Sequence, residues 1–264
     1  ISGDGGCKLK ISKLSVGSSE LNNLSNLNII MGRNGAGKSR FLRSLERGLY
    51  TNGGYYVRYV SPERAGTFKR DGNIITAMSS NPGWLGDTRS VNQASNFKAA
   101  SAALLREEET LYLRRLQDVP EIRNDPSRTF KSDRLDKINA LLTNISMEMG
   151  KADIEFKTLS GELVSADNIS SGESEAVSLA TEILYFFDTI EPSKFNILFL
   201  DEPDVHLHPD LQARLGKLII TMLDEFAEHL DSVAVCITTH SAPFVCSVAA
   251  SSYTSVGTKN FGID

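Results

Sequence analysis

The sequence predicts an α/β fold in which a parallel sheet is buried between helices. Two observations carry this prediction. Short apolar segments have the length and composition of strands buried on both faces; they are residues 27–31, 197–200 and 233–237. Longer segments that indicate helices alternate with these strands; they are residues 39–49, 174–190 and 211–230. Apolar strands that alternate with helices are typical of a sheet covered on both sides.

Residues 94–150 differ from the rest of the chain and predict a helical pair inserted into a single domain that spans residues 1–264. The first helix is expected over 94–119. The second is expected along an apolar seam at spacings of 3, 4, 3 and 4, formed by Leu135, Ile138, Leu142, Ile145 and Met149. Turn-forming Pro, Gly, Asn and Asp residues recur in residues 61–92, so we expect this segment to be mostly loop. Residues 154–164 predict an antiparallel hairpin with its turn at Ser160-Gly161.

The composition narrows the class of protein. The chain has 264 residues, of which 41% are hydrophobic, enough for one large core. The net charge of −5 argues against a protein that binds nucleic acid over its whole surface. A local basic groove is compatible with this charge, so DNA stays among the candidate partners. No apolar run approaches the roughly 18 residues of a membrane span. Cys7, Cys236 and Cys246 lack the spacing of metal ligands, which predicts reduced thiols in a cytoplasmic protein. Together with the lack of a long apolar run, this predicts a protein without a membrane partner.

The strongest chemical signal is a glycine-rich turn between an apolar strand and a helix. It fits G-x-x-x-x-G-K-[ST] and comprises Gly32, Arg33, Asn34, Gly35, Ala36, Gly37, Lys38 and Ser39. A chance match is the competing interpretation, but the strand before and the helix after are the context that defines a P-loop. Backbone N–H groups of such a turn point at phosphate oxygens. We expect Lys38 to bridge the β- and γ-phosphates, Ser39 to bind Mg²⁺, and Arg40 to contribute to the nucleotide site.

A second signal is the pair Asp201 and Glu202 at the end of an apolar strand. The carboxyl edge of a parallel sheet would place these acids beside the glycine-rich turn. Asp201 is expected to hold Mg²⁺, directly or through water. Glu202 is expected to act as the general base on the attacking water. Without the turn, a solvated acidic pair before Pro203 would be a reasonable alternative.

Two further polar segments lie at element ends. Ser170, Ser171, Gly172 and Glu173 precede the helix expected over 174–190; they could form a simple N-cap or a sensor of the γ-phosphate. His240 follows the strand 233–237 and, taken alone, is as consistent with a surface residue as with a catalytic one.

In their order along the chain, these four segments resemble the motifs of the ABC ATPase family. Residues 32–39 look like its Walker A motif, Leu198–Glu202 like Walker B, Ser170–Glu173 like the signature, and His240 like the switch histidine. Gln93 is a weaker match to the Q-loop glutamine that contacts Mg²⁺. The resemblance implies an ABC-type head with an antiparallel β subdomain, ATP and Mg²⁺ as cofactors, and ATP hydrolysis.

The resemblance also implies that two heads sandwich two ATP molecules. Each nucleotide would lie between the P-loop of one subunit and the signature of the other, so Ser170 and Gly172 would act in trans. We therefore expect a homodimer or a higher homo-oligomer.

Three features favour the SMC, Rad50, RecF and OLD branch of this family over transporters. Residues 1–40 contain no aromatic residue to stack on adenine, the signature is Ser-Ser-Gly-Glu, and residues 202–209 read Glu-Pro-Asp-Val-His-Leu-His-Pro. This last run is similar to OLD-like ATPases. His206 and His208 within it could bind a metal ion, but a turn or dimer contact fits them better beside Pro209.

Within that branch, residues 59–66 resemble a segment of the ATPase subunit of the PARIS anti-phage system, and the chain is similar to the compact ATPase subunits of the PARIS and Septu systems. The implied function is an ATP-driven sensor and scaffold that controls an effector, such as a Toprim-type nuclease. The residues after His240 are too few for a Toprim domain, so we expect the effector to be a separate protein. The alternative is an ATPase of DNA repair or chromosome maintenance that acts directly on DNA.

Overall fold

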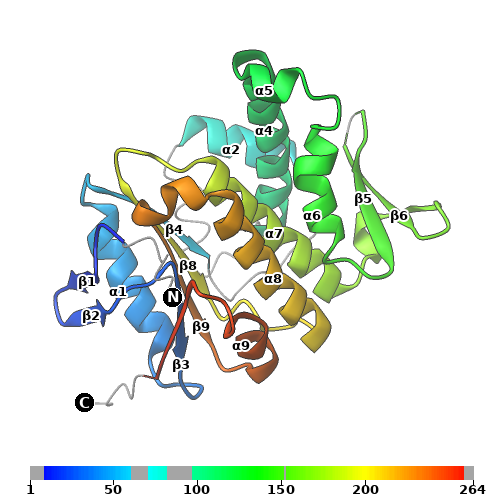
Figure 1. The fold of residues 1–264 in the computed structure, drawn as a ribbon. Coiled ribbons are helices and arrows are strands. Elements are labelled where there is room, and N and C mark those ends of the chain that lie inside the picture. The colour runs from blue at the N-terminus through cyan, green and yellow to red at the C-terminus, as the bar shows by residue number, and fades with distance from the viewer. Residues whose placement is uncertain (1–8, 61–70, 82–96, 152, 259–264) are drawn as a thin grey trace, which may run out of the picture. The chain divides into compact units, whose positions relative to one another are not determined.

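The computed structural model describes residues 9–60, 71–81, 97–151 and 153–258 (Figure 1). The chain forms two compact units. The sheet unit comprises Ile1–Pro62, Thr189–Val205 and Gly216–Asp264, and the helical unit comprises Glu63–Asp188 and His206–Leu215. Each unit is described by itself. Among the described residues, no helix is both long and apolar enough to cross a membrane.

The sheet unit is built on a five-stranded parallel sheet, in the order β10-β3-β9-β8-β4. Its strands are β3 (Leu27–Met31), β4 (Tyr55–Val60), β8 (Phe195–Asp201), β9 (Val233–Thr239) and β10 (Thr254–Thr258). Every residue of β8 and β9 is buried. This confirms the predicted parallel sheet and explains why its central strands are almost wholly apolar.

Helix α1 (Lys38–Tyr50) packs one face of this sheet. Its buried residues Phe41, Leu42 and Leu45 join Ile197 and Phe199 in one apolar core. The short antiparallel hairpin of β1 (Lys13–Val16) and β2 (Ser19–Asn22) lies against α1.

A glycine on α1 makes the contact with this hairpin possible. A Cβ at Gly48 would lie 2.1 Å from Val16 Cγ1, so a larger residue would push the hairpin away. The sheet unit also holds the second part of α8 (Pro209–Glu225), the 3₁₀ segment Ala227–Ser232 and α9 (Ala242–Val248).

The helical unit is organised by α4 (Phe97–Asp118), which packs along α7 (Ser171–Asp188). Its other elements are α2 (Gly72–Ser80), α5 (Pro120–Arg123), the π-helical turn Lys131–Leu135, α6 (Asp136–Asn139), the 3₁₀ turn Ala166–Asn168 and the strands β5 (Ile145–Met149), β6 (Ile154–Thr158) and β7 (Leu163–Val164). The β6–β7 hairpin confirms the predicted turn, because Gly161 N donates to Thr158 O at 2.9 Å.

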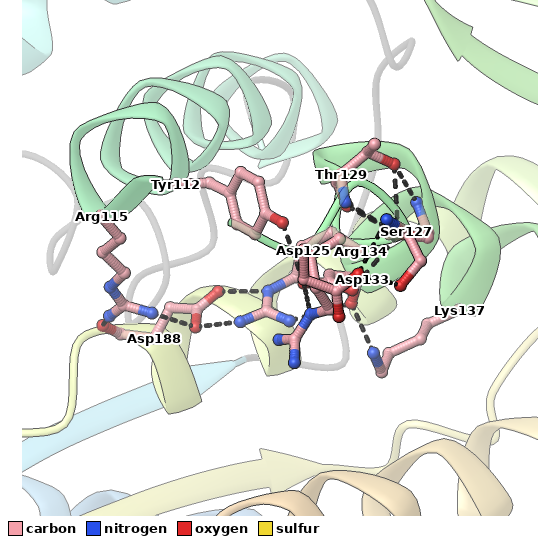
Figure 2. A network of polar contacts seen from close by, with 11 residues as sticks. Tyr112, Arg115, Asp125, Ser127, Thr129, Asp133, Arg134, Lys137 and Asp188 are labelled. Carbon is pink, nitrogen blue, oxygen red and sulfur yellow. Dashed lines mark hydrogen bonds and ion pairs between the residues drawn. The ribbon is translucent and has the colours of Figure 1, made fainter. Parts of the chain in front are cut away.

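A partly buried network of charged side chains connects three helical segments (Figure 2). Asp188, at the end of α7, accepts hydrogen bonds from Arg134 Nε at 2.6 Å and Nη2 at 2.5 Å, and from Arg115 Nη1 at 2.9 Å. Glu108, which is 1% exposed, lies 3.5 Å from Arg134 Nε. The π-helical turn is thus pinned to both α4 and α7.

Two predicted elements were wrong. The second helix of the expected pair ends at Asn139, and the residues after it form β5, because Asn139 Oδ1 accepts from Met147 N at 2.7 Å while Asn139 Nδ2 donates to Met147 O at 3.0 Å. Ile145 and Met147 are buried on one face of the strand. The segment 72–80, predicted as loop, is helix α2; Asp71 caps it by accepting from Asn73 N at 2.8 Å.

Candidate functional site

The glycine-rich turn lies where the sequence predicts it, between β3 and α1. Gly35 and Gly37 have φ angles of +78° and +84°, in the left-handed region that side chains with a Cβ rarely adopt. Gly37 is also the residue before α1, and its carbonyl accepts from Phe41 N at 2.9 Å. The motif glycines therefore serve the sharp change of direction from strand to helix.

Lys38 is folded onto the turn and is almost completely buried. Its ammonium donates to Gly32 O at 3.0 Å and to Arg33 O at 3.1 Å. It also forms an ion pair with Glu202 Oε1 at 3.0 Å. An ammonium has three N–H donors, so each can be used in these contacts. The structure thus brings together the predicted phosphate-binding lysine and the predicted general base.

Glu202 occupies an unusual backbone conformation, with φ +46°. Such a conformation persists only where its surroundings hold it. Here the amide of Glu202 donates to Thr238 O at 3.0 Å and lies 3.1 Å from Thr238 Oγ1. Val205 N in turn donates to Glu202 O at 3.2 Å. Hydrogen bonds to Thr238 of β9 and to Val205, in the turn after Glu202, therefore hold the backbone that directs the Glu202 side chain.

Asp201 is fully buried at the end of β8. Its Oδ2 accepts from Tyr59 Oη at 2.7 Å, and its Oδ1 accepts from Thr238 Oγ1 at 2.5 Å. Arg43 Nε donates to Tyr59 Oη at 3.2 Å. Burial and the neighbouring Asp201 charge raise the pKa of Tyr59 well above its usual range, although Arg43 opposes this. Tyr59 therefore remains a protonated donor at neutral pH.

Tyr59, Arg43 and the role of the Thr238 hydroxyl were not predicted from the sequence. Thr238 lies two residues before His240, and no local pattern marks its hydroxyl as a partner of Asp201. Tyr59 reaches Asp201 because β4 pairs with β8 in the register that places Tyr59 opposite Phe199.

His240 follows β9 in the sheet unit, as expected, and its side chain is 46% exposed. Its Nδ1 lies 3.8 Å from Oδ2 of Asp204, whose side chain is buried. This separation is longer than a hydrogen bond, so the contact is an ion pair only when His240 is protonated.

The predicted signature belongs to the helical unit. Ser170 Oγ accepts from Glu173 N at 3.2 Å and donates to Glu173 Oε2 at 2.7 Å. Glu173 Oε1 also accepts from Asn144 N at 3.3 Å. These are the contacts of a helix cap. Ser170 and Ser171 nevertheless remain exposed at the N-terminus of α7, so a cap and a phosphate contact are compatible. The role in trans stays a prediction.

Gly172 lies close to the segment that follows the acidic pair. A Cβ at Gly172 would lie 3.4 Å from His206 O and 3.5 Å from Leu211 Cδ1. His206 itself has φ +67°, and His208 Nδ1 faces Asp210 N at 3.4 Å. These contacts favour a role for the two histidines in the turn.

The donor set fits Mg²⁺. Asp201 offers carboxylate oxygens and Ser39, at the start of α1, a hydroxyl; hard oxygen ligands are those that Mg²⁺ prefers. Among the described residues there is no group of three or more His, Cys, Asp or Glu that could hold a metal ion, so the protein would share the ion with phosphate oxygens. Arg33, Asn34, Gly35 and Arg40 are exposed, while Gln93 lies outside the described residues.

Several solved structures have a similar arrangement of elements. The SMC head domain from Thermotoga maritima aligns with 14% identity and a TM-score of 0.42, covering 90% of this chain and 89% of its own. An SMC head bound to the C-terminal winged-helix domain of ScpA aligns with 14% identity and a TM-score of 0.44, covering 89% and 90%. An RNase-L inhibitor aligns with 15% identity and a TM-score of 0.40, covering 94% and 36%. No curated protein sequence matches the chain.

The family model of the AAA ATPase domain matches residues 75–245, which is more than half of the chain. The matched range contains Asp201, Glu202 and His240, and the glycine-rich turn precedes it. The described sheet is parallel and carries a P-loop between β3 and α1. The chain therefore belongs to the AAA ATPase domain family, and it is an ATPase with a P-loop fold.

Proposed function

We propose that the chain binds ATP and Mg²⁺ at residues 32–40 and hydrolyses the ATP as an ABC-type head that dimerises around the nucleotide. The observation that carries this proposal is the 3.0 Å contact between Lys38 Nζ and Glu202 Oε1. It places the phosphate-binding cation within reach of the acid that would activate water.

Each residue then has a distinct chemical task. Lys38 supplies positive charge to the β- and γ-phosphate oxygens. Asp201 and Ser39 supply oxygen ligands to Mg²⁺, which when bound neutralises charge on those phosphate oxygens. Glu202 takes a proton from the attacking water, whose oxygen bonds to the γ-phosphorus as the bond to the β–γ bridging oxygen breaks. His240 donates a hydrogen bond to the γ-phosphate.

The Lys38–Glu202 ion pair links binding to activation. A phosphate that accepts hydrogen bonds from Lys38 competes with the Glu202 carboxylate for the same ammonium. When Glu202 loses this partner, the positive charge of Lys38 no longer opposes the transfer of a proton from water to its carboxylate. Nucleotide binding therefore prepares the base, and the base is held by Lys38 until then.

Ser170 and Ser171, which are exposed at the start of the Ser170–Glu173 turn, support the dimeric part of the proposal. They lie at the N-terminus of the 18-residue helix α7, whose N-terminal N–H groups attract anions. In an ATP sandwich this turn would contact the γ-phosphate bound by the other copy, so ATP would become part of the dimer interface and favour the closed state.

The finer proposal is that this ATPase is the switch of an anti-phage system and controls a separate effector protein. It rests on the similarity of residues 202–209 to OLD-like ATPases. Co-purification with the product of the adjacent gene, in an ATP-dependent manner, tests it. Stimulation of ATP turnover by DNA, without any protein partner, would favour the repair alternative.

The central test uses Glu202→Gln. The amide retains the shape of the side chain but cannot accept the proton, so turnover should fall by about 10²–10⁴-fold while ATP still binds. Because hydrolysis no longer dissolves the interface, mass measured by light scattering should rise on addition of ATP and Mg²⁺. Adding Ser170→Arg should block this rise and leave nucleotide affinity unchanged.

Ser165→Arg is the matched control, since Ser165 also caps a short helix by accepting from Asp167 N at 3.4 Å and is exposed. It should leave the ATP-dependent rise intact. Wild-type turnover in Glu202→Gln would place the base elsewhere. Equal effects of the two serine substitutions on mass would contradict a trans contact by Ser170.

A further inference from the structure

A directed chain of hydrogen bonds connects the helix after the P-loop to Asp201. Arg43 Nε donates to Tyr59 Oη at 3.2 Å, and Tyr59 Oη donates to Asp201 Oδ2 at 2.7 Å. The guanidinium carbon of Arg43 also lies 5.8 Å from the centroid of the Tyr59 ring. Because a guanidinium can only donate, the phenol uses its own proton toward Asp201. The orientation of the Tyr59 hydroxyl is therefore set by both neighbours.

The Asp201 carboxylate is held from both adjacent strands. Tyr59 lies on β4 and Thr238 on β9, and these strands flank β8 in the sheet. Thr238 Oγ1 donates to Asp201 Oδ1 at 2.5 Å, so a hydroxyl contacts each carboxylate oxygen. Asp201 is 0% exposed and Tyr59 3%. Hydrogen bonds in such a buried setting are stronger than in water, and they restrict rotation of the carboxylate.

We propose that Tyr59 and Arg43 are positioning residues that orient Asp201 for Mg²⁺, an inference that rests on the proposed nucleotide site. Groups that hydrogen-bond to a metal ligand fix its orientation. Arg43 lies four residues after Ser39 on α1. The helix that carries one metal ligand thus also anchors the other, through Tyr59.

Tyr59→Phe removes the hydroxyl and keeps the ring. Tyr56→Phe is a matched control on the same strand, because Tyr56 Oη lies 2.9 Å from Thr189 Oγ1 and serves a different contact. Mn²⁺ binding is measured by electron paramagnetic resonance of the free ion, in the presence of a non-hydrolysable ATP analogue. Tyr59→Phe should weaken Mn²⁺ binding by about 10–100-fold, and Tyr56→Phe should leave it close to the wild-type value.

Binding of the same analogue in EDTA separates this inference from the proposed function. Tyr59→Phe should bind the metal-free nucleotide as the wild type does. If the wild type binds neither nucleotide nor Mn²⁺, the proposed function fails. If the wild type binds both and the two tyrosine variants behave alike, the positioning role is wrong.

Circular dichroism checks that the variants fold. Should Tyr59→Phe fail to fold, Arg43→Gln decides the matter, because it leaves the Tyr59–Asp201 hydrogen bond in place and removes the group that orients it. It should weaken Mn²⁺ binding several-fold, less than Tyr59→Phe would. Wild-type Mn²⁺ affinity in Arg43→Gln would overturn the proposal.

Discussion

Two aspartates with buried side chains, one in each unit, are held in contrasting ways. Asp201 in the sheet unit accepts from the hydroxyls of Tyr59 and Thr238. Asp188 in the helical unit accepts from the guanidinium groups of Arg134 and Arg115 (Figure 2). Hydroxyls orient a carboxylate without cancelling its charge, whereas a bidentate guanidinium neutralises it. The difference separates a carboxylate suited to bind a cation from one that fastens helices together.

The largest expected effect is on Asp188. Asp188→Asn removes the carboxylate that pairs with two nitrogens of the buried Arg134 guanidinium, whose nearby Glu108 carboxylate lies farther away, at 3.5 Å. Breaking a buried ion pair costs about 3–5 kcal/mol of stability. Urea unfolding at neutral pH measures the change. Asp118→Asn, an exposed change at the end of α4, should alter stability by less than about 0.5 kcal/mol. Equal stability of the two variants would mean that the network of Figure 2 does not hold the helical unit together.

The same substitution at Asp201 should act on metal binding and much less on folding. In Asp201→Asn the amide oxygen can still accept from a hydroxyl, so the free energy of unfolding should change less than in Asp188→Asn. Loss of a residue that supports a metal ligand typically weakens metal binding by about 10–100-fold. Loss of the ligand itself should weaken Mn²⁺ binding to the nucleotide-bound protein by at least as much. Calorimetric unfolding and metal titration on the same sample check both halves. A variant that unfolds readily yet binds the metal normally would reverse the distinction between the two aspartates.

The smallest expected effect is the response to acid. Burial alone would raise the pKa of Asp188, but the hydrogen bonds and charge of Arg134 hold it below its ordinary value of 3.8. A depressed pKa contributes stability above the unfolded-state value, and this contribution is lost as pH falls through the folded-state value. Wild-type unfolding free energy should therefore fall below about pH 4, and the difference from Asp188→Asn should shrink there. A difference that stays constant from pH 6 to the acid limit would contradict the assignment.

The sequence predicted the features that depend on local chemistry. Gly35 and Gly37 have the positive φ that a P-loop turn requires, and the apolar run of β8 ends in Asp201 as expected. It did not predict Tyr59 as a partner of Asp201, because that contact depends on the register between β4 and β8. The pairing of Arg134 with Asp188 was not predicted either, since nothing in the neighbouring sequence marks the two residues as partners.

Periodicity failed where two periods fit the same residues. Ile145 and Met149 are spaced for a helix, but with Met147 between them they also alternate as in a strand. Asn139 resolves the ambiguity through its two hydrogen bonds to Met147, a contact that no window of neighbouring residues reveals.

The positive φ of Glu202 has a consequence for how two consecutive acids can share one site. Along an extended strand, successive side chains point to opposite faces of the sheet, so Asp201 and its neighbour would diverge. A left-handed residue breaks this alternation, at a backbone cost of roughly 1–2 kcal/mol. The turn at +46° swings the chain back at the strand end, which lets Glu202 reach Lys38 while Asp201 stays between its flanking strands. Two consecutive acids can therefore share one site only if the backbone between them departs from the extended strand conformation.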